Sequence, residues 1–323
     1  MSDDIKNVFK MIEENNVKYV DFRFTDPRGK WQHTAQSVGT VDEDMLTDGI
    51  MFDGSSIAGW KDINESDMTL LPDCSSAVMD PFAAQEQLIL FCDVIEPSTG
   101  QPYSRDPRST ARRAQAYLEQ TGIGDTAVFG PELEFFVFDD VRFENSMNRS
   151  FYEVDSIEGP YNTGADYPEG NMGHRPAVKG GYFPVPPVDS LTDIRAEMVT
   201  TALAMGIAME KHHHEVAPSQ HELGQKFDTL LNAADQMQIY KYVVHNVAAQ
   251  YANRPPSCRS QSLAITARAC MSISRSGKTA SRLSPARATR TCRKTAFTTS
   301  AASSSTPRQS THSPMRRPTA TSA

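Results

Sequence analysis

The sequence has no long apolar run and few cysteines. No stretch of its 323 residues approaches the roughly 18 to 20 uninterrupted apolar residues of a membrane-spanning helix. The start, Met1-Ser2-Asp3-Asp4, lacks the basic and apolar segments of a signal peptide. The five cysteines are odd in number and form no Cys-x-x-Cys pair, which argues against a disulfide framework and a zinc ribbon. We therefore expect a cytoplasmic protein with no membrane partner.

Acidic residues are absent from the last part of the sequence. Residues 253–323 contain 13 Lys and Arg, 15 Ser and 11 Thr but no Asp, Glu, Trp or Tyr, whereas residues 1–252 carry 19 bases and all 40 acids. Such a segment does not bury enough apolar surface to offset the entropy of ordering it. We therefore predict a low-complexity, basic, disordered tail at residues 253–323.

A basic tail suggests nucleic acid as a partner, but two features argue against it. The tail has one aromatic residue, Phe297, for stacking on bases, and its arginines are scattered rather than clustered. We expect no nucleic-acid partner. A non-catalytic subunit, or a binding protein with a functional basic tail, stays open as an alternative.

The first part of the chain has the patterns of a small mixed domain. Apolar residues at residues 5–16 have helical spacing, and residues 17–25 alternate apolar and polar side chains as a strand does. A second strand at 31–38 follows a turn and completes a hairpin. We predict an N-terminal domain at residues 1–104.

The patterns continue through a second domain, predicted at residues 105–252. Residues 107–120 suit a helix and residues 127–139 a strand. Capping residues predict two further helices, one at 190–211 and one from residue 228 to about 251.

Two acids share one face of the strand predicted at 127–139. Glu132 and Glu134 are two residues apart, so their side chains point to the same side, and Phe136 and Phe138 continue that face. Two carboxylates on one face repel each other unless a cation lies between them. The pattern fits either a metal or acid–base site or a solvated sheet face, and the phenylalanines indicate partial enclosure.

A second acidic cluster follows the helix predicted at 190–211. Residues 210–222 include Glu210, Glu215, Glu222 and four histidines. Carboxylates suit Mg²⁺ or Mn²⁺ whereas imidazoles also suit Zn²⁺, so the residue types alone do not choose the ion. The alternative is a solvated helix end with histidines near its C-terminal dipole.

Two loops are further candidates. Asp53 begins the segment Asp-Gly-Ser-Ser at 53–56, where an acid acts either as a base or, more commonly, as a turn residue. The rigid aromatic loop at 179–187 either lines a pocket or connects two elements.

Taken together and in this order, five segments resemble bacterial type I glutamine synthetase. They are Met-Phe-Asp-Gly-Ser-Ser at 51–56, Gly-Pro-Glu-Leu-Glu-Phe at 130–135, Lys-Gly-Gly-Tyr-Phe at 179–183, His-His-His-Glu-Val-Ala at 212–217 and Tyr-Lys-Tyr-Val-Val-His-Asn at 240–246. The resemblance implies an α+β fold with a β-grasp-like N-terminal domain and a catalytic domain with an antiparallel sheet. It also implies two stacked hexameric rings, with each active site between adjacent subunits.

The resemblance implies a ligase that joins ammonium to L-glutamate through γ-glutamyl phosphate, with ATP and Mg²⁺ or Mn²⁺ as cofactors. It also assigns site residues by match to the family's motifs. They are Glu134, Glu215 and Glu222 for one divalent ion, Glu132 for a second ion, Glu210 and Phe227 for the nucleotide, and Asp53, which would enter the neighbouring subunit's site to bind ammonium and help remove its proton.

The resemblance stops near residue 252. In the family the chain continues through a Gly-rich segment, a His-x-His motif that completes the second metal site, and arginines for glutamate and phosphate, none of which follows here. Codons for residues 256–275 can be chosen so that a shifted frame reads Phe-Met-Pro-Lys-Pro-Ile-Phe-Gly-Asp-Asn-Gly-Ser-Gly-Met-His-Val-His-Gln-Ser. We therefore interpret the tail as a frameshift product and expect the chain as written to be catalytically incomplete. A paralogue that ligates glutamate to another amine stays open.

Overall fold

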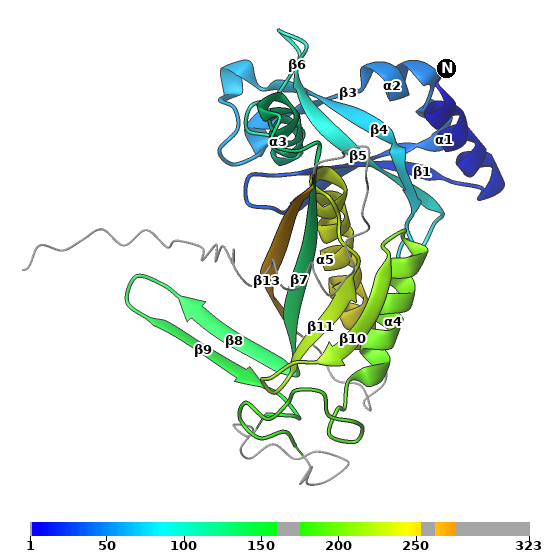
Figure 1. The fold of residues 1–323 in the computed structure, drawn as a ribbon. Coiled ribbons are helices and arrows are strands. Elements are labelled where there is room, and N and C mark those ends of the chain that lie inside the picture. The colour runs from blue at the N-terminus through cyan, green and yellow to red at the C-terminus, as the bar shows by residue number, and fades with distance from the viewer. Residues whose placement is uncertain (1, 160–174, 253–261, 275–323) are drawn as a thin grey trace, which may run out of the picture.

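The computed structural model describes residues 2–159, 175–252 and 262–274, which form a six-stranded sheet, a five-stranded sheet and a two-stranded hairpin (Figure 1). Helices pack on both larger sheets, so the α+β class expected from the sequence is confirmed. None of the helices in these ranges has the length and apolar content to cross a membrane.

The six-stranded sheet lies in the N-terminal part of the chain. Its strands are β1 (Tyr19–Thr25), β2 (Trp31–Ser37), β3 (Ile50–Asp53), β4 (Asp67–Met79), β5 (Gln87–Glu96) and β6 (Gln101–Pro102). The order is β2-β1-β5-β4-β3 with β6 beside β5, and all neighbours are antiparallel except β1 and β5. The hairpin predicted from residues 17–38 is therefore confirmed.

Two helices accompany this sheet, α1 (Asp3–Glu14) and the short α2 (Glu43–Asp48). The Ser2 hydroxyl caps α1 by accepting a hydrogen bond from the backbone N–H of Ile5. Ile5 and Val8 of α1 are buried in one core with the apolar residues of the central strands. The predicted first helix is confirmed. Three short 3₁₀ segments, Val38–Thr40, Gly54–Ser56 and Ile63–Glu65, lie between the strands.

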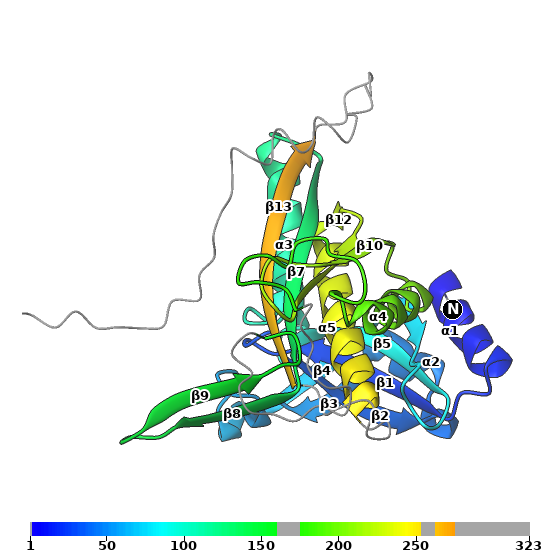
Figure 2. The same cartoon turned by 90° about the horizontal axis from the view of Figure 1, so that it is seen from below.

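The five-stranded sheet is built around the long strand β7 (Thr126–Phe138). It also contains β10 (Met209–His214), β11 (Gln220–Gln225), β12 (Asp228–Thr229) and β13 (Ser262–Ser274). β11 and β12 pair with one edge of β7, β13 pairs with the other edge, and β10 pairs with β11, all antiparallel. The hairpin of β8 (Asp140–Asn145) and β9 (Ser150–Asp155) extends away from the rest (Figures 1 and 2).

Helices cover one face of this second sheet. α4 (Thr192–Ala204) and α5 (Leu230–Ala252) lie along it, and α3 (Pro107–Thr121) packs at its upper end (Figure 1). Leu133, Phe135 and Val137 of β7 are buried in one core with residues of α4 and α5. Because side chains alternate along a strand, Glu132 and Glu134 lie on the opposite face.

Arg108, in the first turn of α3, links the six-stranded sheet to helix α5. Its guanidinium donates to Asp73 of β4 at 2.7 Å and to Asp93 of β5 at 2.9 Å. It also donates to Asp235 of α5 at 3.0 to 3.3 Å. Arg112, one turn later, contacts the same Asp73 and Asp93.

The helix predicted at 190–211 is shorter in the structure. α4 ends at Ala204, and Gly206 adopts a φ of +87°, a left-handed conformation that suits glycine and leads the chain out of the helix. The residues that follow form β10. The histidines at 212–214 therefore stand on a strand rather than at a helix end.

The predicted disorder of the tail does not hold for residues 262–274, which form β13. In this stretch apolar residues, including Leu263, Ile265, Met271 and Ile273, alternate with more polar ones. The apolar positions lie opposite the apolar positions of β7 in the register, as period-two alternation favours. The remaining tail residues lie outside the described ranges, and the boundaries at 104 and 252 stay predictions.

Candidate metal centre

Three strands place a row of metal-binding residue types on the open face of the second sheet. In the antiparallel register His213 of β10 lies opposite Glu222 of β11, and Glu222 lies opposite Glu134 of β7. Directly opposed residues share a face, so these three side chains form one row across the sheet. Glu132 lies two residues from Glu134 on the same face, and Glu215 directly follows β10.

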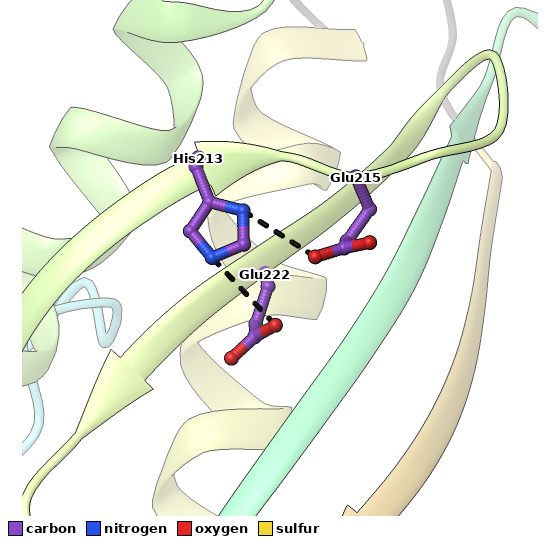
Figure 3. Close-up of side chains that lie close together, drawn as sticks. All are labelled: His213, Glu215 and Glu222. Carbon is purple, nitrogen blue, oxygen red and sulfur yellow. Dashed lines mark ion pairs between the residues drawn. The ribbon is translucent and has the colours of Figure 1, made fainter. Parts of the chain in front are cut away.

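Three side chains at one end of this row lie closest together: His213, Glu222 and the adjoining Glu215 (Figure 3). One ligand atom from each lies within 4.8 Å of the others. Nδ1 of His213 is 3.5 Å from Oε1 of Glu215, and Nε2 is 3.7 Å from Oε2 of Glu222. Imidazole nitrogen and carboxylate oxygen are ligands of divalent cations, so the residues fit such an ion.

The electrostatics of the row favour a cation. Burial is the largest cause that raises the pKa of Glu222, to about 7, and the nearby Glu215, Glu132 and Glu134 raise it further while Lys211 lowers it. Four carboxyl groups therefore interact on one partly enclosed surface. A divalent ion between them would neutralise this repulsion.

A buried network on the other face of β10 and β11 holds the turn between them. Nε2 of His214 lies 2.8 Å from Glu158, which also accepts hydrogen bonds from the backbone N–H of Ser219 at 2.9 Å and the hydroxyl of Ser190 at 2.6 Å. Burial would lower the pKa of His214, but the hydrogen bond to Glu158 and its charge raise it. The network fixes the turn that carries Glu215.

The aromatic loop predicted at 179–187 contacts the site. The rings of Tyr182 and Phe183 stack on each other, and Phe183 meets the His213 ring edge-on with 4.8 Å between centroids. A Cβ atom on Gly181 would lie 2.7 Å from the backbone oxygen of Glu215. Glycine therefore lets this loop approach the turn of the site.

The other predicted site residues lie at different places. Asp53 ends β3 in the N-terminal sheet, and hydrogen bonds from Ser55 and Ser56 to its carboxylate lower its pKa. Glu210 is exposed on β10, and Phe227 is exposed between β11 and β12. The structure thus brings Glu134, Glu215 and Glu222 to one face but leaves Asp53 in the other sheet.

Both predicted domains match one protein family. Residues 16–97 match "Glutamine synthetase, beta-Grasp domain" and residues 104–254 match "Glutamine synthetase, catalytic domain", which together cover more than two thirds of the chain. The chain belongs to the glutamine synthetase family.

Relatives in this family are similar in sequence over about three quarters of the chain. The chain is 66% identical over 248 residues to a glutamine synthetase of Azospirillum brasilense and 56% identical over 247 residues to one of Escherichia coli strain K12. These alignments cover 77% and 76% of this chain but 53% of each relative. The chain therefore spans about half the length of the curated relatives that it matches.

A solved structure shows the same family fold. The chain resembles the cryo-EM structure of Plasmodium falciparum glutamine synthetase with a TM-score of 0.74 and 22% sequence identity, over 85% of this chain and 54% of that one. The β-grasp domain and the catalytic domain with antiparallel strands, both expected from the sequence, are confirmed.

Proposed function

We propose that the chain derives from a ligase that forms L-glutamine from L-glutamate, ammonium and ATP through γ-glutamyl phosphate. The observation that carries this proposal is the acidic row of Glu134, Glu222 and Glu215 on one face of a domain that matches the family's catalytic domain. The high identity to named glutamine synthetases over the same residues supports it.

In this proposal the carboxylates hold divalent ions. Glu134, Glu215 and Glu222 hold one Mg²⁺ or Mn²⁺, and Glu132 supplies a ligand of a second. Transfer of the γ-phosphoryl group of ATP to a carboxylate brings two anions together, and bound divalent ions neutralise the developing charge. The protein's part is to keep the carboxylates on one rigid sheet face, which the buried Glu158 network under the turn supports.

The remaining residues serve the substrates. Glu210 on β10 and Phe227 after β11 bind the nucleotide, and both side chains are exposed. Asp53 serves the neighbouring subunit, where its carboxylate binds ammonium and accepts a proton from it. Its exposed position and lowered pKa keep it ionised for that task. A site shared between subunits requires a homo-oligomer. The proposed assembly is two stacked hexameric rings, and the proposed location is the cytoplasm.

The chain as written lacks groups that this reaction needs. The frame-disrupted tail replaces a second-metal histidine and the arginines for substrate and phosphate. Loss of one group that stabilises a transition state costs about 10²- to 10³-fold in rate, and here several are missing. We therefore expect no measurable glutamine formation by this chain.

A glutamine-formation assay with ATP and Mg²⁺ or Mn²⁺ tests the proposal. The purified chain should be inactive and a frame-restored version active. In the restored version Glu222→Gln should abolish activity, whereas Glu13→Gln, at an exposed position on α1, should not. An inactive restored version, or activity of the written chain within tenfold of the restored one, would contradict the proposal.

A further inference from the structure

We propose that Lys211 binds the phosphate chain of the nucleotide through its side-chain ammonium. The inference rests on the proposed function, which supplies the nucleotide and the ions that accompany its phosphates. It goes beyond that function because it gives a role to a cationic residue that the match to the family's motifs does not assign.

Lys211 stands on the open face of the second sheet, beside the acidic row. In the register of β10 and β11 it lies opposite Gly224, just as His213 lies opposite Glu222. Residues two apart on a strand share a face, so Lys211 is on the same side of the sheet as the row. Glu210, which is proposed to bind the nucleotide, directly precedes it. Lys211 therefore lies on β10 between a nucleotide residue and the residues proposed to hold the ions.

Gly224 makes room for the stem of the Lys211 side chain. A Cβ atom on this glycine would lie 2.7 Å from both Cγ and Cε of Lys211 and 3.3 Å from Cδ. The stem therefore runs closely over the backbone of β11, and Gly224 is buried. A lysine commonly covers a surface with its stem while its charged end stays in water. The contact with Gly224 thus keeps the ammonium over this part of the sheet face.

The ammonium of Lys211 is available for a ligand. The residue is exposed, and its side chain forms no ion pair or hydrogen bond with any described residue. Divalent ions bound by the acidic row would neutralise the carboxylates next to it. The charge of Lys211 then stays free for another anion.

A free lysine at this position fits a polyphosphate. Phosphate groups that transfer to a carboxylate carry negative charge that ions neutralise only in part. An ammonium has three N–H donors and no acceptor, and it is a common phosphate-binding group. This interaction does not need the groups that the tail lacks. The chain as written should therefore still bind a polyphosphate, although we expect it to form no glutamine.

Isothermal titration calorimetry of the purified full chain, with Mg²⁺ present, tests the proposal. ATP and inorganic tripolyphosphate should both bind. Lys211→Met should weaken the binding of both phosphate probes at least about tenfold, the contribution of one hydrogen bond to a charged group, and should not change the binding of adenosine. Lys211→Arg, which keeps the positive charge, should retain most of the affinity.

Gly224→Ala tests the geometry without removing the ammonium. The added Cβ atom would displace the flexible stem of Lys211, so this variant should also weaken both phosphate probes. The double variant with Lys211→Met should bind them no more weakly than Lys211→Met alone, because both changes act on one group. Lys18→Met is the matched control, since it removes the same charge from an exposed site next to β1, and it should bind both probes as the unaltered chain does.

Three results would overturn the role of Lys211. They are no binding of either phosphate probe to the unaltered chain, unchanged affinity in Lys211→Met, and an equal loss in Lys18→Met. The frame-restored version judges the proposed function separately. If it forms glutamine and Lys211→Met leaves its KM for ATP unchanged, the role of Lys211 fails while the proposed function stands. An inactive restored version would contradict the proposed function, whatever the binding results.

Discussion

Replacement of Arg108 by Met should strongly destabilise the protein. The side chain of Arg108 is 7% exposed and donates to Asp73, Asp93 and Asp235, so its loss leaves three partly buried carboxylates close together. Removal of one partner from a buried ion pair costs about 3–5 kcal/mol because the remaining charge is uncompensated. Arg112 still neutralises part of the charge on two of the acids, so we expect a loss near the lower end of this range.

Arg112→Met is the control for this prediction. Arg112 lies one turn later on the same helix and contacts the same Asp73 and Asp93 at 3.0 Å, but its side chain is 44% exposed and does not join α5. Exposed ion pairs contribute about 0.2–1 kcal/mol, so this variant should lose no more than that. Both arginines contact Asp73 and Asp93. The difference in stability between the two variants therefore measures the effect of burial and of the Asp235 contact.

Urea denaturation of both purified variants, followed by tryptophan fluorescence, measures the difference. Trp31 and Trp60 both lie in or against the buried cores and report their unfolding. Equal shifts of the two midpoints, or a loss below about 1 kcal/mol for Arg108→Met, would refute the reasoning that burial decides the strength of this network.

Four further outcomes are expected. Gly49→Ala should cost at least about 1 kcal/mol more than Gly29→Ala in denaturation, because both glycines have positive φ but only at position 49 would a Cβ lie 2.4 Å from a backbone oxygen; equal losses would contradict this. Tyr240→Phe should cost about 1–3 kcal/mol, because its buried hydroxyl donates to the Leu133 oxygen and accepts from the Leu223 N–H, and a neutral effect would contradict this. Burial would raise the pKa of Asp26, but hydrogen bonds from Lys30, Gln32 and Arg28 lower it below 3.8. The ionised Asp26 should therefore stabilise the fold above pH 3.8, and this stabilisation should be lost as the pH falls further. If an Asp26→Asn variant loses as much stability on acidification as the unaltered chain does, this prediction is wrong. Resequencing the gene near the codons for Ala252 to Pro256 should show a one-base insertion or deletion, and codons that do not permit the shifted translation would contradict this.

The sequence alone predicted the parts of the site that depend on local periodicity. Glu132 and Glu134 are two residues apart on a strand, so their shared face follows from alternation, and the buried Leu133 and Phe135 between and beside them fit the other face. The hairpin of β1 and β2 was also predictable, because both strands alternate around a turn.

The sequence places His213 in a candidate metal-binding cluster at 210–222, but it does not predict the strand that puts His213 opposite Glu222, because the predicted helix runs to residue 211 and overlaps the start of β10. Residues 202–209 are all apolar or glycine, so periodicity does not separate the last turn of α4 from the start of β10. Gly206 was the available signal, and a strand after it would have put His213 and Glu215 on one face. The contact between Glu158 and His214 joins residues 56 positions apart and has no local signature.

The pairing of β13 with β7 has a consequence for how the chain behaves in solution. β13 satisfies one whole edge of β7 across thirteen paired positions. A long strand edge left unpaired is a template for strands of other molecules and promotes aggregation. Backbone hydrogen bonds do not require a particular sequence, so even an unselected stretch with alternating apolar residues can cover such an edge. A segment without catalytic residues can thus still protect the chain from self-association.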